Sequence, residues 1–257
     1  MSFRAVVLGS SGGYAGAGKA CSGFLLESDG CKLVLDLGAG ALSNLLKHVG
    51  PDGVDALVVS HMHYDHYSDI HGLVTARRFW PTPLPPLRVM APPRAGVLLR
   101  APLSKESRAE FMGLLDMRAL RGGATYKVGG FKVKAALTRH LHASFSFRVT
   151  AEGRTLCYSG DTEPCEALLE LARGAHLFIC ESTLTSEVPV GISGHMFASQ
   201  AGEIASAAGV GRLLLTHLWP TLDPKRALED AGKKYSGPLD MAVEGLTAYV
   251  GPYPCAT

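Results

Sequence analysis

Short hydrophobic runs alternate with turn signals and helical patterns along the whole chain. In the first half these patterns predict strands over Phe3–Leu8, Gly23–Glu27, Lys32–Leu37 and Val54–Ser60, and helices over Ala41–His48 and His66–Phe79. Val54–Ser60 is almost entirely apolar, which is typical of a strand buried on both faces. Such a strand needs a packing layer on each side of its sheet.

The second half continues the alternation of strands and helices. Hairpins are predicted over Tyr126–Thr138, turning at Gly129-Gly130, and over Ser144–Tyr158, turning at Glu152-Gly153. The remaining patterns predict helices over Ala167–Arg173, Ser199–Ala208 and Pro224–Lys234, and strands over Leu177–Glu181, Arg212–Thr216 and Leu239–Val250. Many strands with interspersed helices indicate an α/β protein whose sheets are covered by helices. Pro81–Pro102 holds seven of the 15 prolines, and we expect an irregular surface stretch there.

Composition excludes several classes of protein. The 257 residues are 47% hydrophobic and 19% charged, which fits a globular chain and argues against disorder. The 25 basic and 23 acidic residues leave a net charge of +2, too little to hold nucleic acid by bulk charge. No apolar run reaches the roughly 18 residues of a membrane span. The six cysteines form no C-x-x-C pair and indicate reduced thiols in a cytoplasmic protein.

The segment His61-Met62-His63-Tyr64-Asp65-His66 directly follows the buried strand Val54–Ser60. In an extended chain His61 and His63 point to the same side, and Asp65 and His66 begin the next helix. Four potential ligands therefore leave one short loop in two directions, which suits two adjacent divalent metal ions. Imidazole nitrogen and carboxylate oxygen favour zinc, with manganese as the alternative.

Three further polar residues follow strands elsewhere in the chain, as His61 does. His140 follows Phe131–Thr138, Asp161 lies just past Tyr158, and His217 follows Arg212–Thr216. Taken alone, Asp161 would be interpreted as a helix cap and each histidine as structural. Beside the loop at 61–66 they become candidate ligands, since a carboxylate can bridge two ions with its two oxygens. His142 is the rival of His140 for this role.

The motif His61-x-His63-x-Asp65-His66, followed by His140, Asp161 and His217 in that order, resembles the metallo-β-lactamase superfamily. The resemblance covers nearly the whole chain and includes Leu8-Gly9-Ser10 and Asp36-Leu37-Gly38-Ala39-Gly40. It implies an αββα four-layer sandwich. It also implies one hydrolase domain over residues 1–257, with a two-metal site at one edge of the sheets.

The same resemblance implies a ligand set. One metal would be held by His61, His63 and His140, the other by Asp65, His66 and His217, with Asp161 bridging. The family spacing to Ser144 and Arg148 favours His140 over His142. The β-lactamases of the superfamily usually lack a histidine at the position of His66, so penicillin hydrolysis is not expected.

A narrower resemblance is to the RNase Z-like branch, which also includes cyclic-nucleotide phosphodiesterases. Cys180-Glu181-Ser182-Thr183 is similar to its His-Glu-Ala-Thr motif, and Gly194-His195 to its second histidine motif. The likeness implies that Glu181 pairs with His195, which serves as the general acid; with Asp65 they are the expected catalytic residues. The chain departs from the branch at Cys180 and at Met196-Phe197. The alternative for Glu181 is a structural strand-end carboxylate.

Two other features of the sequence narrow the range of expected substrates and partners. RNase Z proper carries a glycine- and proline-rich arm that grips transfer RNA, and no such arm lies between Thr138 and Tyr158 or after it. We therefore expect a small-molecule substrate and no transfer RNA. Gly13-x4-Gly18-Lys19 is similar to the start of a phosphate-binding loop, but Ala20 stands where a Ser or Thr must hold magnesium. We interpret this loop as a mobile wall of the metal cleft.

These residues predict a metal-dependent phosphodiesterase for a small phosphodiester such as a cyclic nucleotide. Two ions that share a water lower its pKa, so that hydroxide attacks phosphorus while His195 protonates the leaving oxygen. The alternatives are a lactone or other carboxylic-ester hydrolase on the same metals, and a non-catalytic ligand-sensing protein. The sequence leaves open the substrate, the native metal and the choice between a monomer and a homodimer.

Overall fold

Two sheets of seven strands each form the centre of the part of the chain that the structure describes. The structure is a computed structural model, and it describes residues 3–189 and 193–251. In sheet order, the first sheet contains β14 (Thr247–Tyr249), β1 (Arg4–Gly9), β2 (Gly23–Ser28), β3 (Cys31–Leu37), β4 (Ala56–Val58), β5 (Leu87–Ala91) and β6 (Leu115–Ala119). The second contains β13 (Leu239–Met241), β12 (Leu213–Thr216), β11 (Leu177–Glu181), β10 (Arg154–Tyr158), β9 (Ser144–Ala151), β8 (Phe131–Thr138) and β7 (Thr125–Val128).

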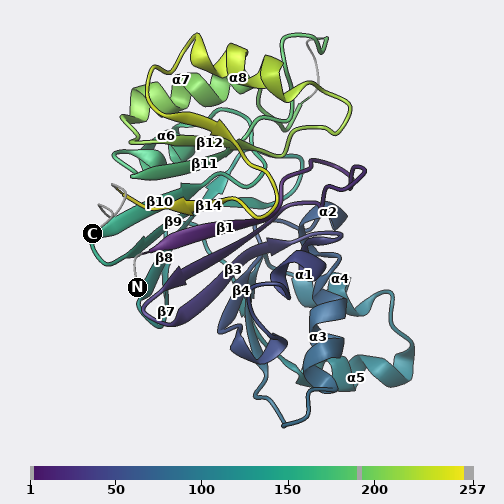
Figure 1. Cartoon of the computed structure of the whole chain (residues 1–257). Helices are drawn as coiled ribbons and strands as arrows, with labels where there is room; N and C mark the ends of the chain where they lie inside the picture. The colour runs from purple at the N-terminus through teal and green to yellow at the C-terminus, as the bar shows by residue number, and fades with distance from the viewer. Residues whose placement is uncertain (1–2, 190–192, 252–257) are drawn as a thin grey trace.

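Helices cover the outer face of each sheet (Figure 1). Beside the first sheet lie α1 (Ala41–Leu45), the 3-10 helix η1 (Pro51–Gly53), α2 (Tyr64–Tyr67), α3 (Ile70–Arg78), α4 (Ala95–Arg100) and α5 (Lys105–Gly113). Beside the second lie α6 (Glu166–Ala172), α7 (Ala198–Ala208) and α8 (Pro224–Gly232). One hydrophobic cluster fills the space between the sheets, and two others join each sheet to its helices. This layering is the αββα sandwich that the sequence predicted.

The strand β4 shows how the sequence produces these layers. Ala56 and Val58 are buried in the cluster between the sheets, whereas Leu57 and Val59 are buried against the helices. A run that is apolar at every position suits such a strand, because both of its faces exclude water. The prediction of a doubly buried strand is confirmed, although the hydrogen-bonded ladder covers only Ala56–Val58.

The expectation for Pro81–Pro102 was wrong. The stretch contains β5, which is largely buried and pairs in parallel with β4 on one side and β6 on the other. Pro86 and Pro92 flank this strand rather than interrupt it, so every ladder N–H is kept. Because the many prolines suggested an irregular stretch, this five-residue strand was not predicted. The elements α4, α5 and β6 were not predicted either.

Two other elements differ from their predictions. The helix expected over His66–Phe79 is divided into α2 and α3, because the backbone N–H of Asp69 donates to the carbonyl of Leu37 instead of continuing the helix. The strand region expected over Leu239–Val250 is two strands in different sheets, β13 beside β12 and β14 beside β1. The chain thus crosses from one sheet to the other within it.

Both hairpins form as predicted. β7 and β8 are joined at Gly129-Gly130, and β9 and β10 at Glu152-Gly153. Five cysteines are free thiols, while Cys255 lies outside the described residues. None of the helices in the described ranges has both the length and the apolar character needed to cross a bilayer.

Candidate metal centre

The predicted site residues come together at one edge of the sandwich, where several strands end. His61 and His63 follow β4, and Asp65 and His66 lie on the short helix α2. From the second sheet, His140 follows β8, Asp161 follows β10 and His217 follows β12. Strand ends that are far apart in the sequence meet here because the two sheets stack face to face.

Two groups of potential metal ligands share one carboxylate. In the first, ligand atoms of His61, His63, His140 and Asp161 all lie within 4.8 Å of one another. In the second, the same holds for Asp65, His66, Asp161 and His217. The shared residue is Asp161, the carboxylate predicted to bridge. His142, the rival of His140, is exposed and belongs to neither group, although its ring lies 5.2 Å from that of His63.

Hydrogen bonds orient four of these imidazoles. In each, Nδ1 faces an oxygen outside the two groups: His61 with Ser60 Oγ (3.1 Å), His66 with Asp36 Oδ2 (2.8 Å), His140 with the Gly194 carbonyl (2.6 Å) and His217 with Thr183 Oγ1 (2.8 Å). In a neutral imidazole whose Nδ1 proton is accepted by such an oxygen, Nε2 keeps its lone pair for the centre. At His66 burial opposes protonation, but Asp161 and Asp36 raise its pKa well above the usual value, so a metal ion there would replace the Nε2 proton. Metal-binding histidines are held by the same kind of outer hydrogen bond.

Buried polar atoms without a hydrogen bond test whether metal fits this centre. His61 and Asp161 are almost completely buried, and neither His61 Nε2 nor Asp161 Oδ1 forms a hydrogen bond within the described part of the chain. Their nearest charged neighbours are members of the same centre, with Asp161 Oδ2 3.6 Å from His61 Nε2 and His66 Nε2 3.3 Å from Asp161 Oδ1. An unpaired buried group costs about 1–3 kcal/mol, so such atoms call for a ligand. A cation on these lone pairs removes the cost. The imidazole and carboxylate donors therefore fit a divalent metal such as zinc.

The electrostatic environment of Asp161 and His61 also favours the protonation states that bind metal. Burial alone would raise the pKa of Asp161, but His217, His66 and His61 around it hold that pKa well below its usual range. The carboxylate is therefore ionised in the interior. Burial lowers the pKa of His61, which disfavours its charged form and leaves a neutral imidazole that can bind metal.

Asp36 is a residue whose role the sequence did not indicate. It is completely buried at the end of β3, and its carboxylate accepts hydrogen bonds from the Ser60 N–H and hydroxyl, from Tyr158 and from His66, each at 2.7–2.8 Å. Asp36 thereby fixes the ring of His66 and the chain just before His61. The only signal was its place in the turn Asp36–Gly40, which follows a buried strand.

The glycine-rich loop after β1 closes over the second group. The Gly13 N–H donates to Asp65 Oδ2 at 2.7 Å. At Gly12 a Cβ would lie 2.4 Å from the carbonyl oxygen of His217, so only glycine permits this approach. A strand, β2, follows the loop. The loop thus lies against the centre and is held there by a hydrogen bond, and its mobility stays a prediction.

His195 and Glu181 lie beside the two groups. His195 Nδ1 is 3.4 Å from Glu181 Oε1 and 3.8 Å from Asp161 Oδ2, and 15% of its side chain is exposed. Burial opposes protonation of His195, but the hydrogen bond to Glu181 and the nearby carboxylates raise its pKa to about 9. Glu181, His195 and His217 also form a third cluster of possible ligands.

Glu181 also has a structural task. Its carboxylate accepts the backbone N–H of Thr162 at 2.7 Å, the backbone N–H of Met196 at 3.0 Å and the hydroxyl of Thr183 at 2.5 Å. It therefore ties the segment after Asp161 to the segment after His195. The functional and the structural interpretation of Glu181 are both compatible with these contacts.

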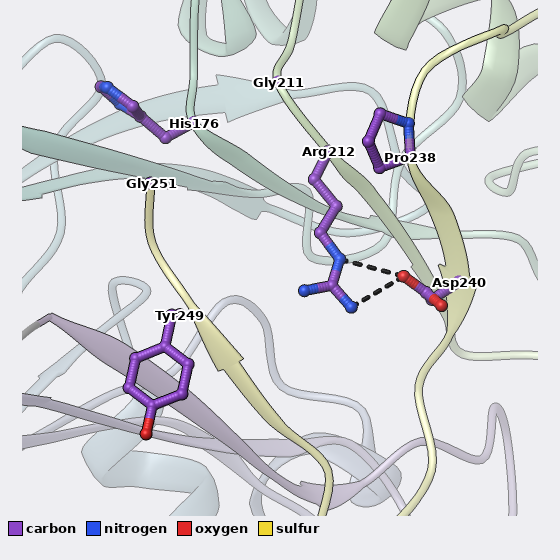
Figure 2. A pocket seen from close by; sticks show the side chains of 7 residues that line it. All are labelled: His176, Gly211, Arg212, Pro238, Asp240, Tyr249 and Gly251. Carbon is purple, nitrogen blue, oxygen red and sulfur yellow. Dashed lines mark hydrogen bonds and ion pairs between the residues drawn. The ribbon is translucent and has the colours of Figure 1, made fainter. Parts of the chain in front are cut away.

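A cavity of about 480 Å³ lies at the amino ends of β11 and β12, away from the candidate metal centre (Figure 2). His176 and Arg212 precede these strands, and Asp240 lies on the neighbouring β13. Arg212 donates to Asp240 Oδ2 through Nε at 3.0 Å and Nη2 at 2.7 Å. Ligands in sheets with parallel strands bind at the carboxyl ends, and the candidate metal centre is at those ends.

Comparison with known proteins agrees with this architecture. Residues 34–218 match the family model described as Beta-lactamase superfamily domain. The chain is 35% identical over 249 residues to the uncharacterized protein ML1173 of Mycobacterium leprae, covering 95% of this chain and 87% of that one. It is 26% identical over 297 residues to a protein named Ribonuclease Z from Methanothermobacter thermautotrophicus, covering 96% of each.

Solved structures have the same fold. The metallo-β-lactamase fold protein YhfI from Bacillus subtilis is similar with a TM-score of 0.86 and 27% identity, over 96% of this chain and 100% of that one. Human tRNase Z, short form, has a TM-score of 0.75 at 20% identity, over 97% and 100% of the two chains. Unliganded yeast PDE1 has a TM-score of 0.74 at 16% identity, over 97% and 99%. The protein therefore belongs to the β-lactamase superfamily and has its metallo-β-lactamase fold.

Proposed function

We propose that this chain is a dinuclear-metal-dependent phosphodiesterase that hydrolyses a small phosphodiester such as a cyclic nucleotide. The observation that carries the proposal is the pair of ligand groups sharing Asp161, with His195 beside them. The superfamily is one of metal-dependent hydrolases. Relatives and structural neighbours named Ribonuclease Z, tRNase Z and PDE1 favour a phosphodiester over other substrates.

The ligands follow from the two groups. His61, His63 and His140 would hold one divalent ion, Asp65, His66 and His217 the other, and Asp161 would bridge them. Zinc fits the donors best, with manganese as the alternative. When bound, two such ions supply an activated water and neutralise negative charge on the substrate oxygens.

The residues of the chain would handle the proton of the leaving group. His195 is partly exposed, so it can reach the substrate, and it lies beside the ligands without belonging to the two main groups. We assign it as the general acid. Glu181 is its positioning residue, since the carboxylate is fully buried and held by two backbone N–H groups. A general acid matters most for a poor leaving group such as a ribose oxygen, which favours a phosphodiester over a lactone.

The proposal is tested by offering metal-replete protein bis(p-nitrophenyl) phosphate and a simple lactone. Steady hydrolysis of the diester, with little turnover of the lactone, is the expected result. The reverse preference would replace the proposal by a carboxylic-ester hydrolase. No turnover of either would indicate a ligand-sensing protein.

We infer further that transfer RNA precursors are not substrates. β8 and β9 are joined by the short segment 139–143, and β9 and β10 by a two-residue turn, so neither connection carries a gripping arm. An assay with a precursor that carries a 3′ trailer tests the inference. Specific cleavage at the trailer junction would show that another surface of the protein binds the RNA. The cytoplasmic location expected from the reduced thiols stays a prediction.

A further inference from the structure

A cavity of about 550 Å³ adjoins the candidate metal centre. His63, one of the candidate ligands, forms part of its lining, and His142 packs edge-to-face on the His63 ring at 5.2 Å. The volume lies within the range of about 300–1,000 Å³ that is usual for sites of small molecules. A substrate held at the metals can therefore extend directly into this cavity.

One wall of the cavity is apolar and does not take part in the core. Helix α4 buries Ala95 and Leu99 among the hydrophobic residues beneath it. Its other face presents Val97 and Leu98 to the cavity, and each of them is 43% exposed. These side chains do not stabilise the core, and covering them with a ligand is favourable because it removes apolar surface from water.

The same wall carries a cation. Arg94 lines the cavity at the start of α4, and its guanidinium forms neither an ion pair nor a hydrogen bond with any residue in the ranges 3–189 and 193–251. Its backbone is left-handed, with φ of 72°, and its carbonyl accepts the Val97 N–H at 2.9 Å to begin the helix. A guanidinium can stack on a flat ring or hydrogen-bond to its acceptors.

We propose that this cavity is the subsite for an organic arm of the substrate, and that the arm is a planar, nucleoside-type ring system. The inference rests on the proposed phosphodiesterase function and names the substrate class for it. Pro93, Val97 and Leu98 cover the apolar faces of the ring, and Arg94 and His142 meet its polar edge. Arg94 and Leu98 are then specificity-determining residues, whereas the scissile phosphate stays at the metals.

Two diesters with the same leaving group test the subsite: thymidine 5′-(p-nitrophenyl phosphate) and methyl p-nitrophenyl phosphate. Since p-nitrophenolate leaves in both cases, a difference in kcat/KM reports on the other arm. We expect metal-replete wild type to prefer the thymidine ester by at least about tenfold. Leu98→Gln and Arg94→Ala should each remove most of that preference through KM, without changing the rate on the methyl ester.

Leu46→Gln is the matched control, because Leu46 has a similar exposure of 45% but does not line the cavity. It should leave both substrates unaffected. Equal rates of wild type on the two esters would overturn the subsite while leaving the phosphodiesterase intact, as would equal slowing of both by Leu98→Gln. Failure of the wild type on both esters would instead overturn the proposed function, and the subsite with it.

Discussion

The two ends of β11 and β12 carry polar residues of very different kinds. At the amino ends, Arg212 and Asp240 line a cavity and bind each other, in an ion pair with 17% and 47% of the side chains exposed (Figure 2). At the carboxyl ends, Glu181 and His217 are buried in a set of imidazoles and carboxylates that leaves lone pairs unused. Polar groups that satisfy one another need no ligand. Buried imidazoles and carboxylates whose lone pairs lack a hydrogen-bond donor indicate that a ligand binds there.

The largest expected effect is at the residue that both ligand groups share. Asp161→Ala removes one donor from each group, so metal content should fall from about two ions per chain to below one, and hydrolysis should be lost with it. Elemental analysis and the diester assay measure the two effects. If the purified wild type holds well under one ion, and added metal does not restore it, the two-metal proposal is wrong. Asp240→Ala, at the other end of the strands, is the control and should keep its metal.

The second-largest effect is expected for His195→Ala, which tests whether His195 is a general acid or a metal ligand. His195→Ala should keep the fold and the metal content, while its rate on a diester with a poor leaving group falls by roughly 10²–10⁴. With p-nitrophenolate, which leaves without help, the loss should be much smaller.

Two outcomes would contradict this assignment of His195. Loss of a metal ion would make His195 a ligand, as its place in the third cluster with Glu181 and His217 allows. Equal slowing of both substrates with the metals intact would make it a substrate-binding residue.

Glu181→Gln should follow the leaving-group pattern of His195→Ala more weakly, and should also lower stability. The new amide places an NH2 where the carboxylate now accepts backbone N–H groups from Thr162 and Met196. The lost hydrogen bond should reduce the free energy of unfolding by about 1–3 kcal/mol. Urea unfolding of the metal-free protein measures this change. A leaving-group effect with unchanged stability would argue that Glu181 acts on His195 alone.

The smallest effect is expected at the amino ends of the strands. Arg212→Ala breaks a partly exposed ion pair, so it should cost about 0–1 kcal/mol of stability. Metal content and kcat/KM should stay within about twofold of wild type, since the pair lies at the far end of β12 from His217. A tenfold loss of activity with metals retained would show that the two ends are coupled, and the contrast between them would fail.

Much of the candidate centre could be predicted from the sequence, because its signals are local. The almost entirely apolar run before His61 predicted a buried strand, and the spacing of His61, His63, Asp65 and His66 placed four potential ligands in one short segment. Gly129-Gly130 and Glu152-Gly153 likewise encode their turns within a few residues. Periodicity and turn chemistry depend on neighbours in the chain, so one sequence was enough to read them.

What only the tertiary structure decided is how distant segments meet. Asp36 became the partner of His66 and Tyr158 through the end of β3, which no spacing in the sequence could reveal. Leu239–Val250 was divided between two sheets, and β5 and α4 brought Val97 and Arg94 to the cavity beside His63. Sheet pairing and layer stacking join residues whose separation along the chain has no fixed relation to their distance in space. The candidate ligands could therefore be identified in the sequence, whereas the lining of the cavity beside His63 came together only when the two sheets packed together.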